Sequence, residues 1–188
     1  MRPNPRYRPA PPGARAGVSM IEMLVVIILI GILAGIAASR LDWVRYRADS
    51  VARGVLADLS AAQRTAVSLQ TDVRITTLSN DRLRIHEDAN NNGAVDGSER
   101  VTFTVLENGF RFGKGSMAGT PAPADATDLS TVTVVFRRDG TASRGGTFYL
   151  SSPVADTTCR YCRAVAIARS TGRAVGYSNA SGAWVRAN

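Results

Sequence analysis

One segment of the chain brings oxygen-bearing side chains together at a spacing that could bind a metal ion. It runs from Asp88 to Glu99 and reads Asp-Ala-Asn-Asn-Asn-Gly-Ala-Val-Asp-Gly-Ser-Glu. Oxygen side chains at positions 1, 3, 5 and 9, glycine at 6 and glutamate at 12 fit the pattern of an EF-hand calcium loop. The alternative is an Asn/Gly/Asp-rich hairpin loop that needs no metal. The predicted ligands of a structural Ca²⁺ are Asp88, Asn90, Asn92, the Ala94 carbonyl, Asp96 and Glu99.

The only two cysteines, Cys159 and Cys162, form a C-x-x-C pair. Such a pair can be a redox motif, half of a zinc site or a small structural disulfide. Zinc needs two further ligands, and His86 is the only histidine. A thioredoxin-like pair is expected in a βαβ context, which the chain lacks. Because the oxidised state is favoured outside the cytoplasm, we expect a disulfide that tightens a loop.

The last part of the chain is strongly basic. Residues 137–188 contain eight arginines and only two acidic residues. A basic surface of this kind can bind phosphate groups, form a solvated rim or pair with acidic neighbours. Few aromatic residues accompany the arginines, although stacking on single-stranded nucleic acid would require them. The candidates for nucleic-acid contact are Arg137, Arg138, Arg163, Arg169 and Arg173.

A single acid, Glu22, lies in the apolar stretch from Gly17 to Ala38. About 20 apolar residues suffice to cross a bilayer, and a charge within hydrocarbon costs roughly 2.5 kcal/mol or more, so Glu22 is a functional candidate. The stretch follows a basic, proline-rich leader without acids, residues 1–16. A cleaved secretory signal would have a shorter apolar run and a small-residue cleavage site after it. A plain membrane anchor leaves Glu22 unexplained.

The order of basic leader, Gly17, four residues, Glu22 and apolar run resembles the prepilin signal of type IV pilins and type II secretion pseudopilins. The resemblance implies that prepilin peptidase cuts between Gly17 and Val18 and that the new amino group, on Val18, is methylated. It also implies that Glu22 of one subunit pairs with the N-terminal ammonium of a neighbour, which relieves the cost of burying both charges. Loss of the leader would lower the net charge from +8 to +4.

Two glycine-containing segments add to this resemblance. Phe136-Arg137-Arg138-Asp139-Gly140 and Ser170-Thr171-Gly172-Arg173-Ala174-Val175 look like hairpin signatures of GspH/FimT-type minor pseudopilins. The resemblance implies a structural subunit of a type IV pilus or type II secretion pseudopilus that acts in priming or tip assembly. Its partners would be other pilin or pseudopilin subunits, prepilin peptidase and the inner membrane, which it crosses once with its head outside the cytoplasm.

Two other functions stay open. The first is a minor pilin that binds DNA in natural transformation through the arginine-rich part; FimT-like members of this kind often carry a second arginine where this chain has Val175. The second is a single-pass, calcium-binding envelope protein that never polymerises. No set of nucleophile and base is visible, so we do not expect an enzyme.

The spacing of apolar residues predicts an α+β fold in which one long N-terminal helix packs on an antiparallel sheet, and the resemblance implies that this fold is type IV pilin-like. After the leader (1–17), residues 18–39 form the membrane or filament-core segment, residues 40–70 form the amphipathic half of the same helix, and residues 71–188 form the β-rich head. The helix stripe comprises Val44, Ala48, Val51, Val55, Leu59, Ala62, Ala66 and Leu69. Alternation and turn residues predict strands at 73–76, 82–86, 101–106, 110–112, 131–136, 147–150, 163–168 and 174–177.

Overall fold

The computed structural model describes residues 18–38, 42–114, 127–154, 158–180 and 182–187. The chain divides into two compact units, Met1–Leu41 and Asp42–Asn188. The predicted leader, including Gly17, lies outside the described residues.

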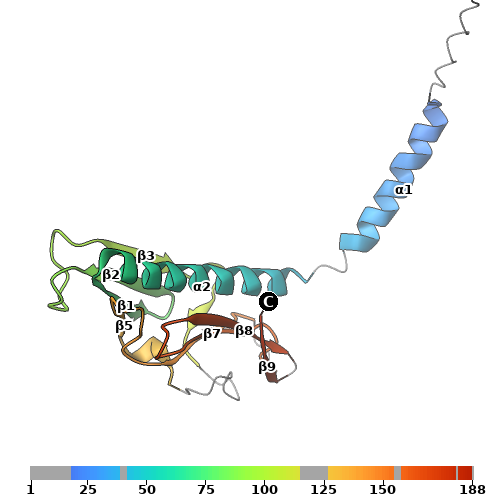
Figure 1. The fold of residues 1–188 in the computed structure, drawn as a ribbon. Coiled ribbons are helices and arrows are strands. Elements are labelled where there is room, and N and C mark those ends of the chain that lie inside the picture. Colours follow the sequence, from blue (N-terminus) through green and yellow to red (C-terminus); the bar gives the residue numbers. More distant parts are fainter. Residues whose placement is uncertain (1–17, 39–41, 115–126, 155–157, 181, 188) are drawn as a thin grey trace, which may run out of the picture. The chain divides into compact units, whose positions relative to one another are not determined.

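The first unit contains helix α1, Met20–Ala38 (Figure 1). Its large apolar side chains, from Met20 to Ile36, are all exposed, and so is Val18 before the helix. Met20 is 90% exposed and Leu33 is 66% exposed. An exposed apolar surface of this extent is expected to be covered by other apolar groups. Among the described residues, no helix combines the length and the hydropathy that crossing a membrane requires.

The second unit begins with helix α2, Trp43–Leu69. The prediction of one uninterrupted helix over 18–70 is wrong at Asp42, whose φ of −82° and ψ of 82° lie outside the helical region. The Asp42 carboxylate accepts a hydrogen bond from the Arg45 backbone N–H at 3.0 Å, so it caps a new helix. At the other end, Gln70 adopts the left-handed conformation and terminates the helix.

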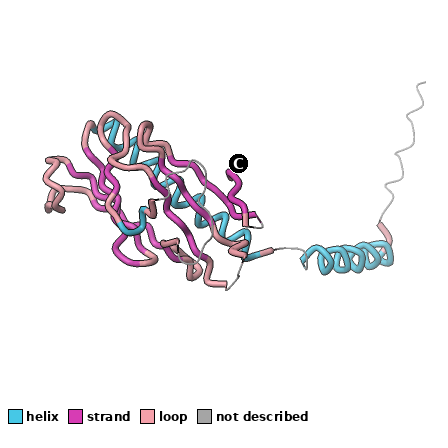
Figure 2. Tube along the Cα trace, turned by 90° about the horizontal axis from the view of Figure 1, so that it is seen from below, coloured by secondary structure: helices cyan, strands magenta, loops and turns pink. Residues whose placement is uncertain are grey.

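Two antiparallel sheets follow, where the sequence had suggested one. The apolar pattern of a strand does not specify which strand it pairs with. The division into two sheets was therefore not predicted. The first sheet, whose strands are labelled in Figure 1, has the order β3-β2-β1-β5, and the second has the order β4-β6-β7-β8-β9. Figure 2 shows the strands in magenta. The strands are β1 (Asp72–Ser79), β2 (Arg82–Asp88), β3 (Val101–Val105), β4 (Arg111–Phe112), β5 (Val134–Phe136), β6 (Gly146–Ser151), β7 (Arg163–Ile167), β8 (Ala174–Ala180) and β9 (Ala183–Arg186).

Helix α2 contacts strands of both sheets, namely β1 and β5 of the first and β7 and β8 of the second. Five positions of the predicted stripe are buried: Ala48, Val55, Leu59, Ala62 and Ala66. Because three of these five are alanines, the helix axis can approach the sheets closely. One core cluster, which includes Leu59, Ile75, Phe136 and Phe148, joins the helix to both sheets.

Two further predictions about strands need correction. Residues 129–131 form a short 3₁₀ helix, Leu129–Thr131, capped by Asp128, so β5 begins later than the predicted 131. Strand β9 was not predicted, because its burial pattern shows one half-buried residue and three exposed ones rather than an apolar face. Its Trp184 packs edge-to-face on Tyr149, with ring centroids 6.1 Å apart.

Candidate functional site

The first predicted ligand of the loop, Asp88, is fully buried at the end of β2. One carboxylate oxygen accepts a hydrogen bond from the Asn92 backbone N–H at 3.0 Å. The other accepts from the Gly93 N–H at 3.0 Å and forms an ion pair with Arg74 of β1. Gly93, at the position where the pattern requires a sharp turn, has a φ of +78°. The start of the loop is therefore held by a protein cation and two backbone donors.

The last predicted ligand, Glu99, is enclosed at the other end of the loop. One oxygen lies 2.7 Å from Nε2 of His86, and both side chains are nearly inaccessible. Glu99 also accepts from the backbone N–H groups of Ala89, at 2.9 Å, and Asp96, at 3.1 Å. The bond with His86, followed by that with Asp96, lowers the pKa of Glu99 from 4.5 to about 2. Since the carboxylate can only accept, Nε2 of His86 is the donor.

The middle of the loop is held by its own side chains. The amide nitrogens of Asn90 and Asn92 donate to one oxygen of Asp96, at 2.6 and 2.9 Å. The structure thus gathers the predicted ligands in one loop, but a calcium ion would compete with Arg74 and His86 for the carboxylates of Asp88 and Glu99. Among the described residues, no three His, Cys, Asp or Glu side chains are grouped so that they could hold a metal. Calcium binding stays a prediction.

The lowered pKa of Glu99 predicts how the loop responds to acid. A carboxyl group whose pKa is lower in the folded state stabilises the fold above its unfolded pKa, and this stabilisation is lost as the pH falls from about 4.5 to about 2. The difference in melting temperature between the wild type and Glu99→Gln should therefore be largest near pH 6 and shrink towards pH 2. A constant difference across that range in thermal melts would contradict this assignment.

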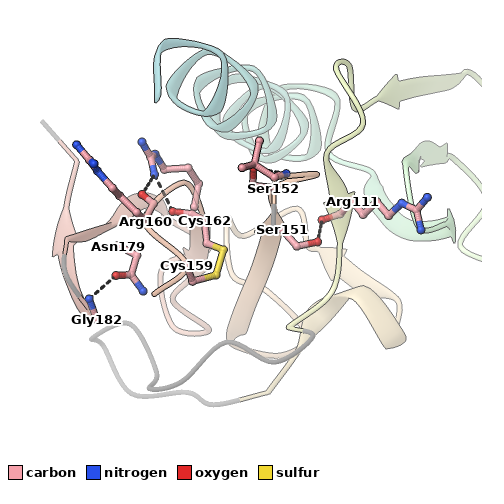
Figure 3. The surroundings of a disulfide bond; sticks show 10 residues. Arg111, Ser151, Ser152, Cys159, Arg160, Cys162, Asn179 and Gly182 are labelled. Atoms are coloured by element: carbon pink, nitrogen blue, oxygen red, sulfur yellow. Dashed lines mark hydrogen bonds between the residues drawn. A yellow bond between two sulfur atoms is a disulfide. The ribbon is translucent and has the colours of Figure 1, made fainter. Parts of the chain in front are cut away.

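The structure joins Cys159 and Cys162 by a disulfide, in the loop before β7 (Figure 3). The Cys162 N–H also donates to the Cys159 carbonyl at 2.9 Å, which closes the loop through the backbone. The buried side chain of Arg163 donates from Nη1 to the carbonyls of Arg160 and Cys162, at 3.1 and 2.8 Å. Its Nε donates to Asp49 of α2 at 2.7 Å. The disulfide loop is thereby tied to the helix.

The two glycine-containing segments form turns that lie against each other and against α2, and we call them the signature turns. Nε2 of Gln63, on α2, donates to the Gly140 carbonyl at 3.0 Å and to the Thr171 carbonyl at 2.6 Å. The Ala142 N–H donates to the Arg169 carbonyl at 2.9 Å. Gly172 has a φ of +60°, and a Cβ atom there would lie 2.3 Å from the Gly140 oxygen. The spacing of the glycines along the chain did not indicate this contact.

The five arginines proposed for nucleic-acid contact fall into two places. Arg137, Arg138, Arg169 and Arg173 are exposed on or beside the two paired turns. Arg163 lies at the opposite end of β7, with a side chain only 3% exposed. The structure therefore brings four of the predicted residues together and gives the fifth a role inside the fold.

The residues of the predicted processing signal are described in part. Val18 precedes α1 and is exposed, and Glu22 lies in the first turn of the helix, where a negative charge interacts favourably with the helix dipole. No partner for the Glu22 carboxylate occurs within the described part of the chain.

The family model described as "Type II transport protein GspH" matches residues 51–172, from α2 to the glycine of the second turn. This span covers most of the chain. The chain belongs to the GspH family. No curated protein and no solved structure matches it.

Membership of the GspH family makes this chain a minor pseudopilin of type II secretion, a structural protein that interacts with other pseudopilins. The predicted family resemblance is confirmed. The matched span contains Gln63, the whole first glycine-containing segment and the second one as far as Gly172. The start of α2 and strands β8 and β9 lie outside it.

Proposed function

We propose that this GspH-family chain primes the assembly of the pseudopilus or occupies its tip. The observation that carries the proposal is the contrast between the two units. The second unit has its own core and needs no cover from α1. Within the first unit, every large apolar side chain from Val18 to Ile36 is exposed, a surface that other apolar groups would cover.

Those surroundings would be the inner membrane before assembly and the helices of neighbouring subunits afterwards. Cleavage between Gly17 and Val18 by prepilin peptidase would release a new ammonium group close to Glu22. The Glu22 carboxylate and the ammonium of a neighbouring subunit would then neutralise each other among apolar helices. Loss of one charge would leave the other buried without a partner, which is strongly unfavourable.

This proposal is tested in the secreting host. Mass spectrometry should find a mature chain that starts at Val18, and Glu22→Ala should lower incorporation into sheared pseudopili by at least about tenfold at an unchanged cellular level. Glu22→Asp, which keeps the charge, serves as the matched variant and should retain part of the incorporation. A mature protein that starts at Met1, or normal incorporation of Glu22→Ala, would overturn the proposal.

A second candidate function is DNA contact during uptake, and the adjacency of the two signature turns favours it. The turns place Arg137, Arg138, Arg169 and Arg173 on one exposed rim. Neutralisation of phosphates by such a rim would give an affinity for DNA that falls steeply with salt. A gel shift in which Arg137→Glu/Arg138→Glu binds DNA like the wild type would exclude this rim as the DNA-binding surface.

A calcium ion bound to this chain would be structural. The ion would be held between β2 and β3 by the oxygens of the loop from Asp88 to Glu99, and it would supply charge neutralisation and no reaction. The exposed amides of Asn90 and Asn92 and the carboxylate of Asp96 are the groups that Arg74 and His86 leave available.

A further inference from the structure

The second unit carries a groove of about 280 Å³ between the start of α2 and strands β8 and β9. Ala52, Leu56 and Tyr177 form its apolar part. We call it the arginine groove, after the four arginines that line it: Arg45, Arg53, Arg163 and Arg186. This position differs from that of the rim formed by the two signature turns, because Arg163 lies at the opposite end of β7.

Three of these four arginines are available to a ligand. Arg45, Arg53 and Arg186 are exposed, and within the described part of the chain none of them has a carboxylate at ion-pairing distance. The groove contains one acid, Asp49, and its carboxylate already accepts from Arg163 at 2.7 Å. The groove therefore carries an uncompensated positive charge.

The disulfide loop fixes the floor of this groove. Arg163 is held by the carbonyls of Arg160 and Cys162, next to the disulfide, and it holds Asp49 in turn. Three chain segments far apart in the sequence, namely the start of α2, the disulfide loop and β9, thus meet in a preorganised arrangement. Preorganisation lowers the cost of ordering side chains when a partner binds.

We propose that the arginine groove receives the carboxylates of an acidic surface on a neighbouring pseudopilin. The proposal rests on the assembly function proposed above and names the contact surface for it. Arginine suits this task because its planar guanidinium group donates two parallel hydrogen bonds to a carboxylate. The apolar patch of Ala52, Leu56 and Tyr177 beside the charges resembles the mixed composition of a protein–protein interface.

The order of charges along α2 favours carboxylates over a nucleic-acid backbone. Arg45, Asp49 and Arg53 follow one another at intervals of four residues, so the two arginines stand about 12 Å apart with an acid between them. A continuous run of phosphates would place a negative charge against Asp49. Separate carboxylates on a protein surface can meet Arg45 and Arg53 and avoid Asp49. Because like charges repel, the groove cannot meet itself in a two-fold dimer, and its contact with a partner is heterologous.

The test measures binding of the full-length chain, in detergent micelles, to each of the other purified pseudopilins of the same secretion apparatus. Arg45→Gln/Arg53→Gln should weaken binding to at least one of them by about tenfold or more, and the wild-type affinity should fall with salt. Both side chains are exposed, so the variant should keep the wild-type melting temperature. The rim variant Arg137→Glu/Arg138→Glu is the control and should bind its neighbours like the wild type.

Three outcomes would contradict the proposed role of the arginine groove. Wild-type binding by a correctly folded Arg45→Gln/Arg53→Gln, or an equal loss in the rim variant, would overturn the proposal. So would a single-stranded 15-nucleotide DNA that binds the wild type but not Arg45→Gln/Arg53→Gln, while binding of pseudopilins is unchanged. A wild type that binds no pseudopilin at all and is not incorporated into pseudopili would instead contradict the assembly function itself.

Discussion

Replacing Gly172 by alanine should lower the free energy of unfolding by about 3 kcal/mol. Two costs add up: a residue with a side chain is strained by about 1–2 kcal/mol at a φ of +60°, and its Cβ atom would lie 2.3 Å from the Gly140 oxygen. Relief of that contact would push the two signature turns apart and stretch both hydrogen bonds of Gln63. For a unit of this size, we expect the melting temperature to fall by roughly 10 °C.

Gly54→Ala is the matched control. Gly54 lies in α2, where a Cβ atom would meet nothing within 4 Å. Alanine has the higher helix propensity, so this variant should be as stable as the wild type or more stable by up to about 1 kcal/mol. Urea unfolding followed by circular dichroism measures both variants. If Gly172→Ala unfolds at the same urea concentration as Gly54→Ala, the two turns do not make the close contact described here.

The second large effect is expected at Asp88. Asp88→Ala removes a fully buried carboxylate, which leaves Arg74 and the Gly93 backbone N–H without this acceptor and the Asn92 N–H with Asn90 Oδ1 alone. Loss of one partner of a buried ion pair costs about 3–5 kcal/mol, and the partial exposure of Arg74 (26%) favours the lower end. Asp96→Ala should cost less than about 1 kcal/mol, because among the described residues its carboxylate accepts only from Asn90 and Asn92.

The Asp96→Ala variant also tests the calcium prediction. A ligand that binds only the native state raises its stability, so calcium should raise the melting temperature of the wild type above that in chelator. Asp96 costs little to remove from the metal-free loop, yet it is one of the predicted ligands. The calcium-dependent increase should therefore disappear in Asp96→Ala although this variant folds normally. Equal melting temperatures of the wild type in calcium and in chelator would refute the prediction.

Local signals in the sequence were sufficient to predict most helices and strands of the second unit. The stripe of Ala48, Val55, Leu59, Ala62 and Ala66 predicted the buried face of α2, and alternation predicted the positions of most strands. The break at Asp42 was missed, because an aspartate within a long amphipathic pattern also suits an exposed helical position. The division into two sheets depends on which strands pair, and pairing is decided by contacts between distant residues.

Candidate site residues were found where the signal lies within one segment. The loop from Asp88 to Glu99 is visible in the sequence, but the side chains that hold its carboxylates, Arg74 and His86, come from strands β1 and β2. The arginine groove was not predicted, because it combines residues from positions 45 to 186. Arg163 was predicted to bind nucleic acid from composition alone, and its burial against Asp49 could be learned only from the fold.

Gln63 has a consequence for how sequences of this kind can vary. Its single amide group holds the carbonyls of Gly140 and Thr171, in turns separated by about thirty residues of chain. An insertion in one turn would move one carbonyl out of reach and bring new atoms into the narrow space beside Gly172. We therefore expect the lengths of the two turns to be inherited together, so that relatives that lengthen one turn also alter the other or replace the glutamine.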